Sequence, residues 1–194
     1  MKSKRQLQKE QTRQRIIDTA YRVYTEMGFG ATTAVIAKEA GISHGAVFSH
    51  FPSVNELLEC LIEEFGHALA LEIHDLAESS GSVEELLQIH LEVLIRHEGF
   101  YTRLITERSL LPQEVQYTFA NTQSTFAHHF GRIFEKEIQN HTVKDIPVHL
   151  LLHTWLGMLH YYLWNKDFFA PGAPVLTRYS EELIDTFLKL IKDK

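Results

Sequence analysis

Apolar residues recur every three or four positions along most of this 194-residue chain. That spacing places them on one face of an α-helix, as Ile16, Ala20 and Tyr24 illustrate in the first segment. A half-buried β-strand would instead alternate apolar and polar residues, and no segment does so convincingly. We therefore expect an all-α protein.

Glycine, proline and serine divide this pattern into about nine helices. Gly28 and Gly41 end the first two, and Pro52 interrupts the chain after the third. Ser53 and Ser82 each precede a glutamate by three positions, which is the pattern of a capping box at a helix start. The expected helices cover about residues 5–27, 33–40, 44–50, 53 to the loop at 79–82, 83–97, 99–109, 113–140, 146–166 and 176–192.

The formal net charge of -6 is unevenly distributed along the chain. Residues 1–58 contain eight Lys or Arg against five Asp or Glu, whereas residues 59–194 contain eleven against twenty. A basic N-terminal part on an acidic remainder predicts an anionic partner for the N-terminal part alone. A solvated, frayed N-terminus is the alternative explanation.

Three further features indicate a cytoplasmic protein without a membrane partner. The longest apolar stretches are far shorter than the ~20 residues that span a bilayer. No apolar segment follows the positive charges at the N-terminus, so a secretory signal is not expected. The single cysteine, Cys60, excludes an intrachain disulfide and fits a reducing compartment.

Residues 36–51 contain two very short apolar patterns on either side of Gly41. The glycine permits a sharp turn, and small alanines before it permit close packing. Thr32 and Ser43 stand where the caps of these two helices are needed. Such a pair can form a helix-turn-helix, whose second helix enters the major groove of DNA, although an ordinary helical corner has the same pattern. The outward positions are His44, Gly45, Ala46, Ser49 and His50.

The same region resembles the N-terminal domain of the TetR family of transcriptional regulators. The resemblance rests on the run from Gly28 to Thr33, on Ile36-Ala37, on the runs from Ala40 to Ser43 and from Val47 to Phe51, on Ser53, and on Glu56-Leu57. It covers about 50 residues at the N-terminus, and the rest of the chain matches the family only in being helical.

This resemblance implies a three-helix DNA-binding domain over residues 1–52, followed by a helical ligand-binding and dimerisation domain over residues 53–194. The implied partners are double-stranded DNA with a palindromic operator, a small-molecule effector and a second copy of the chain. The implied function is that of a transcriptional regulator, a repressor that its effector releases from the operator. No enzymatic activity and no cofactor are expected.

Carried over residue by residue, the resemblance assigns DNA contacts to two groups of side chains. The start of the second helix would donate to phosphate, and the third helix would face the groove. The chain departs from the family at three positions. Phe48 stands where the family usually has Tyr, Val54 where it usually has Lys, and His44 where it often has Lys. Each change removes a donor or a fixed charge that would contact phosphate.

Separately, we expect the basic N-terminal residues Lys2, Lys4, Arg5 and Lys9 to replace phosphate contacts that this chain lacks. The DNA-binding candidates are Thr32, Thr33, Ser43, His44, Gly45, Ala46, Phe48, Ser49, His50, Lys4 and Arg5.

The later part of the chain is rich in aromatic residues, most of which are expected in the core. A minority, with a few polar side chains, would line a mainly apolar cavity that suits a hydrophobic or aromatic small molecule. The ligand-binding candidates are Phe100, Tyr101, Leu104, Phe119, Phe126, His153, Trp155 and His160.

Two apolar stripes near the C-terminus predict a four-helix contact between subunits. The alternative is that they close the core of a single chain. The stripes are Val148, Leu151, Leu152, Trp155, Leu159 and Tyr162 on one helix, and Leu176, Tyr179, Leu183, Phe187 and Ile191 on the other.

Twelve histidines raise the question of metal binding. His149 and His153 are four positions apart on one expected helix, a spacing that can hold a metal ion, but no third ligand stands near them. We therefore expect no metal site, and a helical metal-dependent enzyme with histidine ligands is the alternative function. Cys60 has only glutamates as charged neighbours along its helix, so we expect a packed residue and not a reactive thiol.

Overall fold

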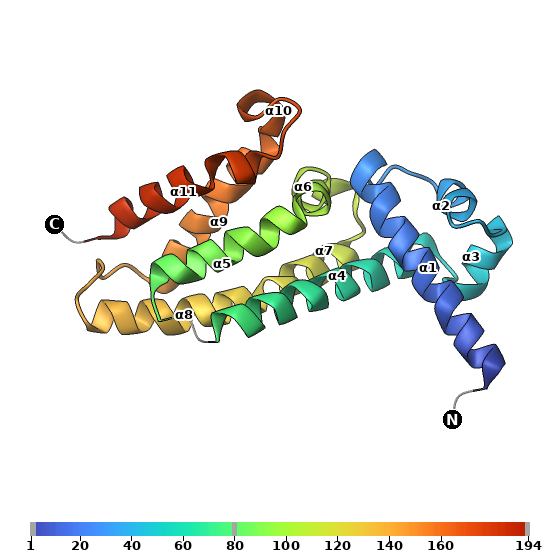
Figure 1. Cartoon of the computed structure of the whole chain (residues 1–194), viewed down its shortest axis with the longest axis horizontal. Coiled ribbons are helices and arrows are strands. Elements are labelled where there is room, and N and C mark those ends of the chain that lie inside the picture. The colour runs from blue at the N-terminus through green and yellow to red at the C-terminus, as the bar shows by residue number, and fades with distance from the viewer. Residues whose placement is uncertain (1–2, 79–80, 193–194) are drawn as a thin grey trace.

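The computed structural model describes residues 3–78 and 81–192, and within them the chain is helical and contains no strand (Figure 1). The expected all-α class is confirmed. The helices are α1 (Lys4–Met27), α2 (Thr33–Glu39), α3 (His44–His50), α4 (Val54–Ala77), α5 (Val83–Arg96), α6 (Glu98–Thr106), the 3-10 helix η1 (Arg108–Leu110), α7 (Gln113–Thr122), α8 (Ser124–Gln139), α9 (Val148–Trp164), α10 (Lys166–Phe169) and α11 (Val175–Ile191).

The helices fall into two groups in space (Figure 1). The first three gather at one end, where α1 packs against α2, α4 and α6, and α2 packs against α3. The long α4 leads from this end into a bundle, where it packs against α5, α7 and α8, while α9 and α11 cover the far side. We refer below to α1–α3 as the head and to the remaining helices as the body.

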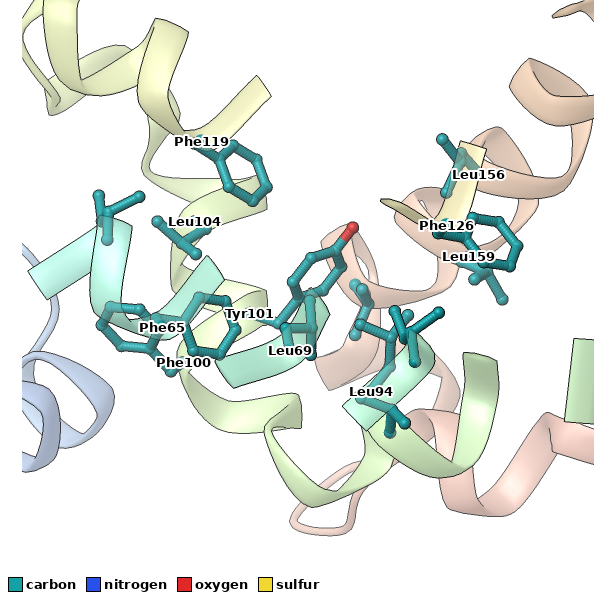
Figure 2. Packing of buried hydrophobic residues seen from close by; sticks show 14 of the residues in the cluster. Phe65, Leu69, Leu94, Phe100, Tyr101, Leu104, Phe119, Phe126, Leu156 and Leu159 are labelled. Atoms are coloured by element: carbon teal, nitrogen blue, oxygen red, sulfur yellow. The ribbon is translucent and has the colours of Figure 1, made fainter. Parts of the chain in front are cut away.

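An aromatic cluster joins the head to the body. The ring of Tyr21 in α1 lies 4.6 Å from that of Phe100 in α6, and the ring of Phe65 in α4 lies 4.9 Å from Phe100. Phe65 and Phe100 are packed side by side in Figure 2. Because the rings come from three helices, this cluster holds the C-terminal half of α1 against α4 and α6.

Serine side chains begin three of the helices as the sequence predicts. The hydroxyls of Ser43, Ser53 and Ser82 each accept a hydrogen bond from the backbone N–H three residues later, at 3.1–3.2 Å. Thr32 also stands at a helix start, but its side chain makes no capping bond. Local capping by serine therefore explains where α3, α4 and α5 begin.

The basic N-terminal residues belong to a helix and not to a frayed arm. Ser3 forms a complete capping box with Gln6, so α1 already begins at Lys4. Lys4 and Arg5 are consequently held on a helical surface, where both are exposed. Lys2 lies outside the described residues.

The expected single helix over residues 113–140 is wrong, because the chain breaks at Gln123 into α7 and α8. The Thr122 hydroxyl donates to the carbonyl of Phe119, and the Gln123 side chain donates to the hydroxyl of Tyr101. Neither glycine nor proline marks this break, so the pattern could not reveal it. The short α10 was likewise not expected, which accounts for the difference from nine helices.

The two C-terminal apolar stripes close the core of the chain itself. Leu151, Trp155 and Leu159 of α9 are buried, as are Leu183 and Phe187 of α11. The prediction that these stripes meet a second subunit is therefore wrong, because α9 and α11 use them to pack on each other and on the body. Separately, none of the described helices is long and apolar enough to cross a membrane.

Gly66 allows α4 to approach α7 closely, and its replacement tests this packing. An alanine Cβ at Gly66 would lie 2.0 Å from the methyl carbon of Thr122, so we expect Gly66→Ala to lower the free energy of unfolding by about 1–3 kcal/mol. At Gly131 in α8 a Cβ meets no atom within 4 Å, so Gly131→Ala should be neutral or stabilising by up to about 1 kcal/mol.

Urea denaturation of both variants measures these changes, and Thr122→Ser should partly rescue Gly66→Ala because it removes the clashing methyl group. Equal stability of the two alanine variants would contradict the close approach.

Candidate functional site

The outer surface of α3 carries most of the side chains that the sequence predicts to contact DNA. Val47 and the following Phe51 are buried and anchor α3 from inside, so its other side faces solvent. Of the predicted DNA-binding residues, those exposed around α3 are Ser43, His44, Gly45, Phe48 and Ser49, and those half-buried are Ala46 and His50.

Two of the predicted contacts are occupied within the head. The hydroxyl of Thr33 lies 2.9 Å from Nε2 of His44, and Thr33 is only 8% exposed. The His44 ring in turn meets the edge of Phe48, with centroids 5.1 Å apart. Thr33 therefore ties α2 to α3, and of the two threonines only Thr32 presents an exposed side chain.

His50 is held in its neutral form at the inner end of α3. Burial lowers its pKa, and the positive charges of Lys9 and Arg13 lower it further. Its Nδ1 atom is buried and has no hydrogen-bond partner among the described residues. A charged His50 in the free protein is therefore not expected at neutral pH.

Cys60 has a basic neighbour that the sequence did not reveal. Nη2 of Arg13 in α1 lies 2.7 Å from its sulfur, and Nη1 bonds Glu64 at 3.2 Å. Burial nevertheless raises the pKa of the Cys60 thiol, and Glu64 opposes the lowering effect of Arg13. The thiol therefore stays protonated, as the sequence predicted, although for a different reason.

The body contains a very small internal cavity of about 10 Å³. It lies between helices α4, α5, α6, α8 and α9, and its lining is mainly apolar. Figure 2 shows Tyr101 among the buried apolar side chains, with its hydroxyl turned toward Phe126 and Leu156. The lining residues are Leu69, Ile73, His90, Leu94, Tyr101, Thr122, Gln123, Phe126 and Leu156.

Polar side chains around this cavity form two hydrogen-bonded groups, one of three residues and one of two. Gln123 donates to the Tyr101 oxygen at 3.1 Å, so the Tyr101 proton is free to point to Nε2 of His160, which is 3.0 Å away. On the other side, Nε1 of Trp155 donates to Nδ1 of His90 at 3.0 Å. Both histidines thus act as acceptors, which requires them to be neutral.

The pKa values agree with these hydrogen bonds. Burial lowers the pKa of His90 to about 3, and it lowers that of His160 to about 4 with a further contribution from Arg108. Burial also raises the pKa of Tyr101 well above its usual range. At neutral pH the cavity is therefore lined by uncharged groups, which favours an uncharged or apolar occupant.

The predicted ligand-binding residues divide into three sets. Tyr101 and Phe126 line the cavity, and Phe119, Trp155 and His160 contact its lining. Leu104 and Phe100 are fully buried, with Phe100 in the cluster at the head. His153 is not brought there, since it lies exposed on the outside of α9.

Sequence reasoning missed His90 and Gln123 among the cavity residues. His90 occupies an apolar stripe of α5 and stacks on Phe126 with ring centroids 3.6 Å apart. A polar residue in an otherwise apolar stripe was the available signal. Gln123 gave none, because its position depends on the break between α7 and α8.

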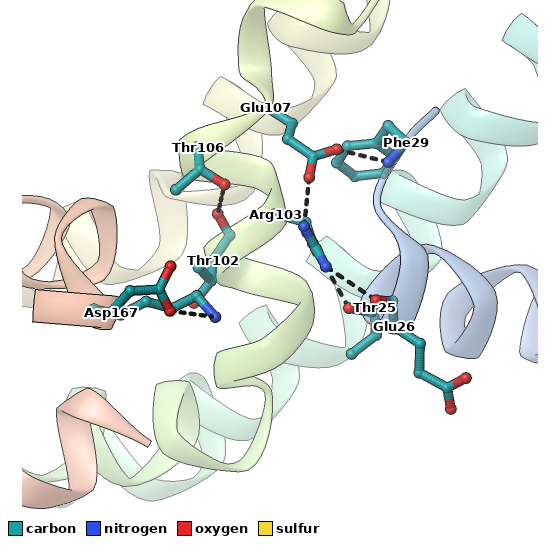
Figure 3. Close-up of polar contacts among 9 residues, drawn as sticks. Thr25, Glu26, Phe29, Thr102, Arg103, Thr106, Glu107 and Asp167 are labelled. Carbon is teal, nitrogen blue, oxygen red and sulfur yellow. Dashed lines mark hydrogen bonds and ion pairs between the residues drawn. The ribbon is translucent and has the colours of Figure 1, made fainter. Parts of the chain in front are cut away.

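A polar contact on the other side of α6 connects the body to the head (Figure 3). Arg103 donates to the carbonyls of Thr25 and Glu26 at the end of α1, at 3.2 and 3.0 Å. It also pairs with Glu107 at 2.7 Å, and Glu107 accepts a hydrogen bond from the N–H of Phe29 at 2.7 Å. We call Arg103 and Glu107 with these three backbone groups the α1–α6 latch.

Gly28 permits this latch. Its φ is +80°, and an added Cβ would lie 2.6 Å from an oxygen of Glu107. Only glycine accommodates both the backbone conformation and the close carboxylate. Since α6 carries Tyr101 on one side and the latch on another, the helix lies between the cavity and the head.

The buried histidines make the stability of the fold depend on pH. An unfolded histidine titrates near pH ~6.5, whereas the folded values are about 3 for His90 and about 4 for His160. Below about pH 6.5 the unfolded chain binds protons that the folded chain cannot, so the free energy of unfolding falls by up to about 1.4 kcal/mol per pH unit for each histidine.

Urea denaturation between pH 7 and pH 5 measures this slope, which His160→Gln should reduce. The exposed His67 supplies the control variant, His67→Gln, with the wild-type slope. Stability that stays constant over this range would contradict the burial of neutral histidines.

Comparison with known proteins places the head in one family. The family described as "Bacterial regulatory proteins, tetR family" has a model that matches residues 16–61. This segment contains most of α1, all of α2 and α3, and the start of α4.

Two curated relatives extend the match along the chain. The HTH-type transcriptional regulator SrpR of Pseudomonas putida is 42% identical over 64 residues, which are 32% of this chain and 30% of that protein. The nucleoid occlusion factor SlmA of Haemophilus influenzae (strain PittGG) is 28% identical over 130 residues, which are 64% of this chain and 57% of that protein. The matches thus span about half the length of SlmA and about a third of SrpR.

The whole fold also has solved counterparts. The transcriptional regulator FadR from Bacillus subtilis, solved in complex with stearoyl-CoA, superposes with a TM-score of 0.75 over 90% of this chain and 97% of that chain, at 17% identity. At this identity the likeness concerns the fold. The match to the TetR family of bacterial regulatory proteins thus covers residues 16–61, and the rest of the chain shares its fold with FadR.

Proposed function

We propose that this chain is a ligand-responsive, DNA-binding transcriptional regulator, a repressor that acts in the cytoplasm and has no enzymatic activity. The observation that carries the proposal is the exposed outer face of α3, which Val47 and Phe51 anchor from inside. Residues 1–52 form the DNA-binding domain, and residues 53–194 form the ligand-binding and dimerisation domain.

In the proposed complex α3 lies in the major groove and α1 contributes backbone contacts. Nδ1 of His44, whose Nε2 contacts Thr33, and the hydroxyl oxygen of Ser49, which donates to the carbonyl of Ala46, remain available to base edges. Gly45 lets the helix approach closely. Phe48 cannot donate to phosphate, so the exposed Thr32 and the basic residues of α1 supply those contacts.

Fluorescence anisotropy with DNA from the region upstream of the gene tests this proposal, with a scrambled duplex for comparison. Gly45→Glu places a carboxylate against the groove at a position where a Cβ meets nothing within 4 Å, so the specific affinity should be lost while the fold is kept. Gly131→Glu makes the same change at an equally open glycine of α8 and should bind normally. Normal binding by Gly45→Glu would exclude this face.

The basic start of α1 should account for part of the salt dependence of DNA binding. Each phosphate contact that is lost reduces the slope of log K against log salt by about 0.9. We therefore expect Lys4→Gln/Arg5→Gln to lower the slope by about two per chain. Lys136→Gln/Lys192→Gln removes the same charge from exposed sites of the body and should leave it unchanged.

Titrations at several salt concentrations measure these slopes. If both double variants change the slope equally, the effect comes from net charge and not from contacts of α1.

The proposed subunit contact lies on the outer face of α9, opposite the stripe that closes the core. Tyr161 is 61% exposed and Trp164 is 60% exposed, and Leu150 lies on the same side of the helix. Large apolar side chains exposed in this grouping are typical of a protein interface. A two-fold axis at this face would pair α9 with its copy and orient the two heads toward a palindromic operator.

Two tyrosines with equal exposure provide a matched test of this dimer. Tyr161→Glu should shift the protein to monomers, because it places a charge in the apolar interface. Tyr117 in α7 is also 61% exposed but lies elsewhere, so Tyr117→Glu should leave the dimer intact. Sedimentation velocity at micromolar concentration distinguishes the outcomes, and a dimeric Tyr161→Glu would contradict this interface.

The effector of the proposed regulator is a small, mainly hydrophobic or aromatic molecule in the cavity of the body. A volume of about 10 Å³ holds no more than a water molecule, so binding must separate the surrounding helices. Tyr101, Gln123 and His90 offer neutral polar anchors. The apolar acyl chain bound by FadR, which has the same fold, is consistent with this class of ligand.

Coupling would pass from the cavity through α6 to the head. A ligand that displaces the Tyr101 hydroxyl shifts α6, and α6 carries the α1–α6 latch. A tenfold loss of operator affinity requires the ligand to bind the released form ~1.4 kcal/mol more tightly. Uncharged long-chain aliphatic and aromatic compounds are the first probes, with thermal stability and operator binding as readouts.

Tyr101→Phe should weaken binding of a responsive probe, whereas Tyr117→Phe should not. A probe that binds equally to both variants occupies another site.

A further inference from the structure

A cluster of three potential metal ligands lies where the end of α4 meets α8. Nδ1 of His74 lies 3.2 Å from Nε2 of His129, and Nδ1 of His74 lies 3.7 Å from an oxygen of Glu78. The ligand atoms of all three residues lie within 4.8 Å of one another. The sequence predicted no compact set of ligands, because His74 and His129 are 55 residues apart.

The distance between the two histidine nitrogens is compatible with a shared metal ion. Two imidazole nitrogens bound to one Zn²⁺ at tetrahedral angles are about 3.3 Å apart, since each Zn–N bond is about 2.0–2.1 Å. The observed 3.2 Å between the two histidine nitrogens is close to this value. The exposed side chain of Glu78 places a carboxylate oxygen 3.7 Å from Nδ1 of His74.

The environment of His129 gives a second reason. This histidine is 2% exposed, and its Nδ1 has no hydrogen-bond partner among the described residues. Among the residues that the structure describes, the hydrogen bond between its Nε2 and Nδ1 of His74 is the one that holds the ring, and burial of an imidazole with so few partners is costly. A metal ion at this point would replace that hydrogen bond by bonds to both ring nitrogens, Nε2 of His129 and Nδ1 of His74.

The position on α4 also favours a cation. His74 lies in the last turn of α4 and Glu78 is its C-cap, where the helix dipole places partial negative charge. The positive charge of Arg132 acts on His129 and opposes a bound cation, and its guanidinium donates to the carbonyl of Ala77 at 3.3 Å. We therefore expect weaker binding than at a site with four thiolates.

We propose that His74, Glu78 and His129 bind a divalent transition-metal ion of the Zn²⁺ type, with the fourth position left to water. Two nitrogens and one carboxylate oxygen suit Zn²⁺ or Co²⁺ and not Mg²⁺ or Ca²⁺, which prefer oxygen ligands. The ion joins α4 to α8 beside the cavity, which Ile73 and Phe126 of the same two helices line. In the regulator proposed above, and resting on that function, the ion would oppose separation of these helices.

The test uses the full chain without a histidine tag, after treatment with a chelator and in the absence of DNA. Calorimetric titration with Zn²⁺ should give one ion per chain, and Co²⁺ should give the visible absorption of a tetrahedral complex. His74→Ala and His129→Ala should each lower the affinity by at least about tenfold. Because His74 is exposed, its replacement leaves the packing of the body intact.

Two histidines outside the cluster provide matched controls. His128 is exposed and adjacent in sequence, and His149 belongs to the exposed pair on α9. His128→Ala and His149→Ala should both keep the wild-type affinity. The site is excluded if the wild type binds no Zn²⁺, if only one of His74 and His129 matters, or if His149→Ala alone removes binding. DNA binding by the metal-free protein is measured separately, so failure of this site leaves the proposed function untouched.

Discussion

The end of α1 depends on a side chain from another helix. The last carbonyls of a helix have no partner within it, and in α1 those of Thr25 and Glu26 accept hydrogen bonds from Arg103 in α6. Glu107 completes the arrangement by binding Arg103 and the N–H of Phe29. The head is therefore held at its angle by α6 as well as by the apolar contacts of α4.

The opposite side of α6 carries a buried hydroxyl, that of Tyr101, which needs hydrogen-bond partners. Tyr101 is fully buried and must satisfy its hydroxyl, which it does with Gln123 and His160. A helix of nine residues thus serves two sets of hydrogen bonds that cannot be adjusted independently. Any molecule that competes for the Tyr101 hydroxyl also acts on the latch, which provides a physical route from cavity to head.

The sequence predicted what depends on neighbours along the chain and missed what depends on distant partners. Ser43, Ser53 and Ser82 marked helix starts correctly because capping is local. The break at Gln123 was missed because it depends on Tyr101 and on the close approach at Gly66. The apolar stripes identified the buried faces of α9 and α11, but they did not reveal that these faces pack against helices of the same chain. Contacts between Arg13 and Cys60, or between His74 and His129, gave no signal because 47 and 55 residues separate them.

The most direct test of this route is amide hydrogen exchange in the full chain without any ligand. Tyr101→Phe removes one hydroxyl from the cavity network, and Tyr117→Phe removes one from an exposed site. If α6 transmits the change, exchange in Tyr101→Phe becomes faster at the N–H of Phe29 and along the neighbouring end of α1, while Tyr117→Phe matches the wild type. Faster exchange confined to the helices around the cavity, with the Phe29 amide as protected as in the wild type, would contradict the account.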